Sequence, residues 1–150
     1  MVDDILDQIQ SEHKIIQNIF ELILEEPIKD QQQQSNLFSV LKKNLLPHIK
    51  SEEKLFYPLL TEHSDTKETA LEALEEHRVA EMVLKELEQM SPSDERWIAK
   101  LTVLSEFVNH HIEEKEDAVF KGARDIIPQE ERINMLQSFA ESEESMKSTM

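Results

Sequence analysis

Four of the six histidines in this sequence stand at positions that an internal repeat relates to one another. The tetrapeptide at 12–15 aligns with the one at 76–79, and the stretch 41–57 aligns with 104–120. The repeat-related histidines are His13, His48, His77 and His111. Imidazole binds metal ions and transfers protons near neutral pH, so these four positions are candidates for metal binding or acid–base chemistry.

Each of these histidines falls on an apolar stripe at helical spacing. His48 follows Leu45 by three residues, and His111 follows Val108 in the same way. Side chains at this spacing share a helix face, so four imidazoles are expected to converge in a bundle core. A single core histidine is usually a packing residue. Four of them have eight ring nitrogens that need partners, and a bound metal ion satisfies such a cluster.

One carboxylate stands where it can join the histidines. Glu52 lies four residues after His48, on the same helix face and one turn further along. Imidazole and carboxylate without sulfur suit iron, manganese or zinc, and bridging carboxylates in bundle cores suit a two-metal site. The chain has no cysteine, which excludes disulfides, iron–sulfur clusters, thiolate zinc sites and thiol catalysis.

Composition points to helices. The 150 residues include one glycine and five prolines, and the formal net charge is −16. So little glycine excludes an all-β or dinucleotide-binding fold, and the negative field disfavours nucleic acid as a partner. No apolar run approaches the ~20 residues of a membrane span. The acidic N-terminal stretch lacks the basic region of a signal peptide, so we expect a cytoplasmic protein without a membrane partner.

Helical periodicity predicts four long segments. They run from about Asp3 to Pro27, from about Ser35 to Leu60 with a kink at Pro47, from about Thr66 to Met90, and from about Asp94 to Ala123. The run 31–34 is expected to be a polar linker, and Pro128 to open a short fifth helix before ten frayed residues. We predict an all-α, up-down-up-down four-helix bundle over 1–124, then a short helix and frayed tail over 125–150.

Four motifs resemble those of the hemerythrin-like (HHE cation-binding) domain family. They are Glu12-His13-Lys14, the stretch 48–58, Glu76-His77-Arg78 and the stretch 110–116, and the resemblance runs from about residue 5 to residue 124. It implies a four-helix bundle with a non-haem di-iron centre, held by histidines from all four helices and two bridging carboxylates. Carried over to this chain, the metal ligands are His13, His48, Glu52, His77 and His111.

The second bridging carboxylate is where the chain departs from the family pattern. Four residues after His111 stands Lys115, and the repeat likewise places Lys115 opposite Glu52. Taking His110 as the ligand restores the pattern through Glu114, but the alignment of Phe120 with Tyr57 favours His111. We expect Lys115 to repel a second metal ion and to pair with Glu52, leaving a mono-metal or metal-free core, unless Glu114 or Glu116 replaces the missing carboxylate.

The sequence therefore predicts an iron-binding protein that binds or senses a small diatomic ligand, oxygen or nitric oxide, or iron itself. The alternative is a degenerate bundle, its site weakened by Lys115, that serves as an interaction or regulatory module with an unidentified protein partner. An oxidase-like or peroxidase-like enzyme is disfavoured because few carboxylates stand at ligand spacing. His63 and His110 are expected to lie outside the site.

Overall fold

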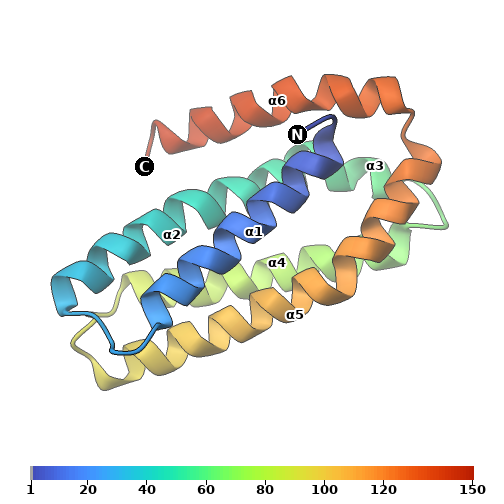
Figure 1. The fold of residues 1–150 in the computed structure, drawn as a ribbon. Helices are drawn as coiled ribbons and strands as arrows, with labels where there is room; N and C mark the ends of the chain where they lie inside the picture. Colours follow the sequence, from blue (N-terminus) through green and yellow to red (C-terminus); the bar gives the residue numbers. More distant parts are fainter. Residues whose placement is uncertain (1) are drawn as a thin grey trace.

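The chain folds into a bundle of four long helices with a further helix laid along its side (Figure 1). The computed structural model describes residues 2–150. The bundle helices are α1 (Ile5–Leu24), α2 (Gln31–Ser51), α4 (Lys67–Glu88) and α5 (Glu95–Ile126). A π-helix, η1 (Glu52–Phe56), and the short α3 (Tyr57–Thr61) extend α2, and α6 (Gln129–Lys147) follows the bundle. The predicted all-α bundle is confirmed.

Short polar side chains fix where the helices begin. Asp4 caps α1 by accepting hydrogen bonds from the backbone of Leu6 and Asp7, and Asp94 caps α5. Asp30 caps α2, and Gln33 returns a bond to its backbone in a capping box. The prediction of a polar linker at 31–34 is therefore wrong. These glutamines form the first turn of α2, because Asp30 satisfies the backbone donors that the helix start leaves free.

The irregularity expected near Pro47 lies further along the chain. The α-helix continues through Pro47 to Ser51 and then widens into the π-helix η1. The N–H of Tyr57 donates to the carbonyl of Glu52, the longer hydrogen-bond step that defines a π-turn. A π-turn inside a helix frequently marks a functional site, and this one begins at the candidate ligand Glu52.

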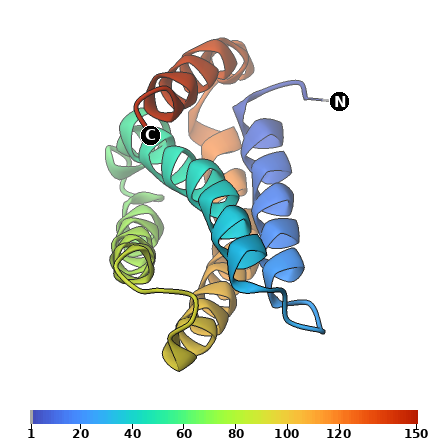
Figure 2. The same ribbon diagram turned by 90° about the vertical axis from the view of Figure 1, so that its left-hand side faces the viewer.

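The C-terminal helix is longer than predicted. It runs from Gln129 to Lys147 and packs against α1, α2 and η1 (Figures 1 and 2). The chain therefore differs from the expected short helix with ten frayed residues, because α6 has 19 residues and extends to Lys147. Buried side chains near its end, Phe139, Ser142 and Glu143, dock the helix onto the bundle and keep its last turns ordered.

The bundle core consists of two apolar clusters with a polar layer between them. Along α1, Ile9 belongs to one cluster and Ile16 to the other, and His13 lies between them. Along α4, Ala73 and Ala80 flank His77 in the same way. The histidine layer therefore sits inside the bundle, with apolar packing on both sides. Among residues 2–150, no helix is both long enough and apolar enough to cross a membrane.

Candidate metal centre

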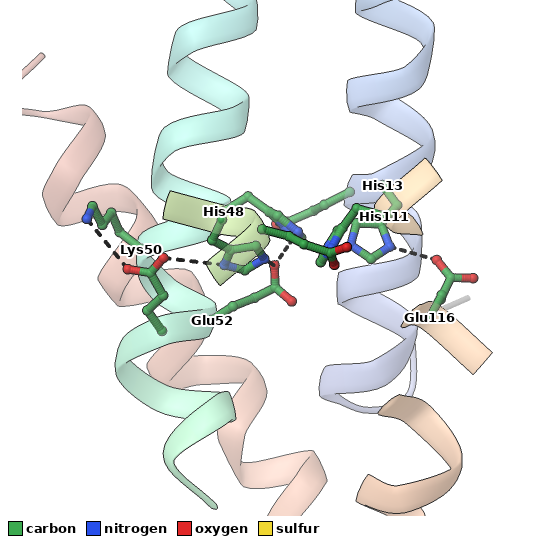
Figure 3. A network of polar contacts seen from close by, with 10 residues as sticks. His13, His48, Lys50, Glu52, His111 and Glu116 are labelled. Carbon is green, nitrogen blue, oxygen red and sulfur yellow. Dashed lines mark hydrogen bonds and ion pairs between the residues drawn. The ribbon is translucent and has the colours of Figure 1, made fainter. Parts of the chain in front are cut away.

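One repeat-related histidine comes from each long helix, and all four border one cavity in the bundle interior. Figure 3 shows His13, His48 and His111 together with Glu52. Each of the four histidines is at most 8% exposed. They form two edge-to-face pairs, His13 with His48 at 4.9 Å between ring centroids and His77 with His111 at 5.1 Å. Sequence periodicity predicted this convergence. His110 and His63 are exposed and lie outside the layer, as expected.

Glu52 lies among these rings and is 2% exposed. Its Oε1 atom is 2.7 Å from His48 Nε2 and 3.8 Å from His77 Nε2. One ligand atom each of His13, His48 and Glu52 lies within 4.8 Å of the others, which is close enough for a single metal ion. A cavity of about 20 Å³ borders all four histidines and Glu52, and that volume admits about one water-sized species.

Each histidine also has a glutamate behind it, on the side of Nδ1. Glu12 accepts from His48 at 2.7 Å, Glu76 from His111 at 2.6 Å, and Glu116 from His13 at 2.6 Å. The fourth glutamate, Glu53, lies 3.3 Å from Nδ1 of His77. A carboxylate on one ring nitrogen fixes the tautomer and turns the other nitrogen towards a metal, so this arrangement is typical of metal-binding histidines.

We predicted no supporting role for these glutamates, and considered Glu116 only as a replacement for the missing bridging carboxylate. The signal was nevertheless present, because the internal repeat relates Glu12 to Glu76 and Glu53 to Glu116. The structure gives related residues the same task in both halves. Their partners lie on neighbouring helices rather than on their own, so spacing along one helix does not reveal them.

The charges of the layer are strongly coupled. Burial alone lowers the pKa of His48, but the carboxylates of Glu52 and Glu12 outweigh it and raise that pKa to about 10. Burial raises the pKa of Glu52, and His48 with its neighbouring imidazoles outweighs this and brings it to about 2. The layer thus holds a buried imidazolium beside a buried carboxylate, a charge pattern that a bound cation would replace.

Three buried atoms of the layer, His48 Nε2, Glu52 Oε1 and His77 Nδ1, lack a hydrogen bond of good geometry among the described residues. His48 Nε2 and Glu52 Oε1 lie 2.7 Å apart as an ion pair, but outside hydrogen-bond geometry. A buried polar atom without a partner is costly, and such atoms in native proteins indicate an ion, a water or a functional role. Nitrogen and oxygen donors this close together fit a transition-metal ion such as iron.

Lys115 does not behave as expected. Its Nζ lies 3.2 Å from Glu72 on α4, so the predicted pairing with Glu52 is wrong. The reason is geometric: α5 directs this side chain towards the acidic outer side of α4 rather than into the histidine layer. Glu114 pairs with His110 on the exposed side, and Glu116 is taken by His13, so neither replaces the missing carboxylate.

The C-terminal helix α6 adds contacts to His48, Ser51 and Glu12 that the sequence pattern did not predict. Phe139 lies edge-on to His48, with 6.3 Å between ring centroids, and the hydroxyls of Ser51 and Ser142 are 2.8 Å apart. Glu143 lies beside Glu12, and burial together with that carboxylate raises the pKa of Glu143 to about 8. The apolar period of α6 is weak, so its pattern gave little sign of a buried face.

Comparison with known proteins agrees with this geometry. A family model described as "Hemerythrin HHE cation binding domain" matches residues 4–123, which include all four histidines and the four bundle helices apart from the last residues of α5. Searches of curated proteins and of solved structures returned no match. The matched range ends before α6, so the contacts that this helix makes behind His48 lie outside the family domain.

Proposed function

Since the chain belongs to the hemerythrin HHE cation-binding domain family, we propose that it is a non-haem iron-binding protein that binds or senses a small diatomic ligand, oxygen or nitric oxide, or iron itself. Family membership supports binding of a metal cation. The choice of iron and of a diatomic ligand is our proposal, drawn from the donor set and from the small volume of the cavity.

The residues proposed to hold the metal share one layer of the bundle. They are His13, His48, Glu52, His77 and His111. The observation that carries the proposal is the position of the buried Glu52 carboxylate, whose Oε1 lies 2.7 Å from Nε2 of His48 and 3.8 Å from Nε2 of His77. Glu12, Glu76 and Glu116 accept from Nδ1 of His48, His111 and His13, so Nε2 of each of these rings is the nitrogen left to bind a metal once it is deprotonated.

The surroundings favour a very small ligand. Besides the polar donors, the cavity is bordered by aliphatic side chains and Phe107, and its volume is about 20 Å³. This space holds about one water-sized species, so it suits a very small ligand and leaves no room for an organic substrate. A bound iron ion supplies an open coordination position for that ligand.

The test is an anaerobic iron titration of the purified protein, followed by absorption spectra before and after oxygen or nitric oxide is added. We expect bound iron and a ligand-dependent charge-transfer band. His48→Ala is expected to abolish both. The matched control is His63→Ala, which removes an exposed histidine and is expected to change neither.

The same titration distinguishes the proposed function from the alternative function. A degenerate bundle that acts as an interaction or regulatory module would bind no iron and give no band, whatever the ligand. Lys115 is the residue that motivates this alternative. Because Lys115 pairs with Glu72 and leaves Glu52 free to face the histidines, we favour metal binding over the degenerate module.

A further inference from the structure

We propose that the centre holds a single metal ion, bound in the half formed by His13, His48 and Glu52, rather than the two ions that the family pattern implies; of the five candidate ligands, His77 and His111 then line the centre without holding a second ion. This inference rests on the proposed metal binding and concerns its stoichiometry. Within residues 2–150, donor atoms of three or more ligand-type side chains gather within 4.8 Å in two groups, and neither group includes His77 or His111.

The number of carboxylates that face the centre favours one metal ion over two. Glu52 is the one whose oxygen approaches the Nε2 atoms of the histidines. Glu76 also borders the cavity, but its Oε1 accepts from His111 Nδ1 on the outer side. Two divalent cations held a few ångströms apart in a buried site repel each other strongly, and bridging carboxylates offset that repulsion. One carboxylate supplies half of what the family arrangement uses.

The direction of the α5 side chains also favours one metal ion, because it leaves the second half of the centre without a carboxylate. The position that should carry the other bridging carboxylate is Lys115, whose ammonium is held by Glu72. Its neighbours are engaged as well, Glu114 by His110 and Glu116 by His13. The second half of the centre therefore keeps two imidazoles, His77 and His111, and has no carboxylate of its own.

The π-helix that bears Glu52 makes the two halves of the centre unequal. The repeat aligns Glu52 with Lys115, but η1 is a π-helix, whereas α5 is a regular α-helix at the aligned position. The π-turn brings Glu52 and Glu53 to opposite nitrogens of His77, with Oε1 of Glu52 3.8 Å from Nε2 and Oε2 of Glu53 3.3 Å from Nδ1. The two halves thus differ in backbone as well as in charge, and the asymmetry favours the half that carries Glu52.

The test is a metal count in the wild type and in three variants, by calorimetric titration of the metal-free protein with ferrous iron under argon and by elemental analysis after desalting. Lys115→Glu returns a carboxylate to the repeat-related position, and Lys115→Met removes the cation without adding one. Lys121→Glu is the matched control, since it makes the same charge change at an exposed position of α5. Circular dichroism of each metal-free protein checks that the bundle is intact.

We expect one ion per chain in the wild type and in all three variants, because α5 directs position 115 towards Glu72 and away from the histidines. Two ions of similar affinity in the wild type would overturn the single-ion inference and leave the proposed function standing. Two ions in Lys115→Glu would show that a carboxylate at this position reaches the centre, and would overturn the argument from the direction of α5. Absence of binding in every protein would overturn the proposed metal-binding function, and the inference with it.

A second measurement locates the ion. His13→Ala is expected to weaken iron binding by more than the roughly 10–100-fold that loss of a supporting partner costs, since it removes a direct ligand. His111→Ala, an equally buried histidine of the other half, is expected to weaken it less than His13→Ala. Equal losses in the two variants, with unchanged stability of the metal-free proteins, would overturn the assignment of the ion to this half.

Discussion

Among single residues, His48 links metal binding to pH. Its Nε2 faces the centre beside Glu52. Its pKa of about 10 means that both ring nitrogens are protonated at neutral pH. A metal ion on Nε2 must displace the proton on that nitrogen. We predict that affinity for iron rises about tenfold per pH unit between roughly pH 6 and pH 8. Calorimetry in buffers of different ionisation enthalpy measures the released proton, and an affinity independent of pH would contradict the prediction.

The supporting glutamates make a separate prediction at the level of residues. Glu116 accepts from His13 Nδ1, and its pKa is lowered mainly by that hydrogen bond. Glu116→Gln weakens this orientation, so we expect iron affinity to fall by about 10–100-fold. Glu113→Gln, an exposed change on the same helix, is the control and should leave affinity unchanged. Competition with a chromophoric chelator gives both affinities.

Among the helices and their connections, the single glycine marks the closest approach between α5 and the segment before α4. A Cβ atom at Gly122 would lie 2.6 Å from Cγ2 of Thr66, whose hydroxyl is held by the carbonyl of Leu60. We predict that Gly122→Ala lowers the free energy of unfolding by about 1–3 kcal/mol through overpacking.

The Gly122 prediction has an internal control. Thr66→Ser removes Cγ2 and keeps the hydroxyl, so the clash disappears. In that background Gly122→Ala should stabilise the protein by about 1 kcal/mol, the helix propensity gained over glycine. Urea unfolding of the four proteins of this cycle measures the change in sign. A destabilisation that persists in the Thr66→Ser background would refute the steric explanation.

The C-terminal helix is the second element with a testable role. Phe139 is fully buried and packs near His48, so Phe139→Ala should cost about 3–5 kcal/mol of stability. Ile133→Ala, at a position 46% exposed on the same helix, should change stability by less than about 0.5 kcal/mol. Thermal unfolding followed by circular dichroism compares them. Equal effects would mean that α6 is not docked as described.

For the molecule as a whole, we expect a fold that does not depend on the metal. Apolar clusters lie on both sides of the histidine layer, so the core is built without an ion. We predict that the protein treated with chelator remains helical and unfolds cooperatively. Iron at about 100 times its Kd should then add about 2.7 kcal/mol and raise Tm by roughly 5–10 °C. Loss of helical signal on chelation would contradict this prediction.

Patterns along the chain were enough to predict the helices and most of the candidate centre. Apolar residues at helical spacing define which face of each segment is buried, and that face carries His13, His48, Glu52, His77 and His111. Local chemistry also set the helix starts, as at Asp4 and Asp94. These features were predictable because they depend on residues within a few positions of one another along the chain.

Which residues meet across helices became clear only in the folded bundle. Glu12 supports His48 on the next helix rather than its neighbour His13, and Lys115 pairs with Glu72 instead of Glu52. These pairings depend on how adjacent helices are offset and rotated against each other, which periodicity along one helix does not specify. The docking of α6 likewise depends on the surface that the folded bundle offers to Phe139.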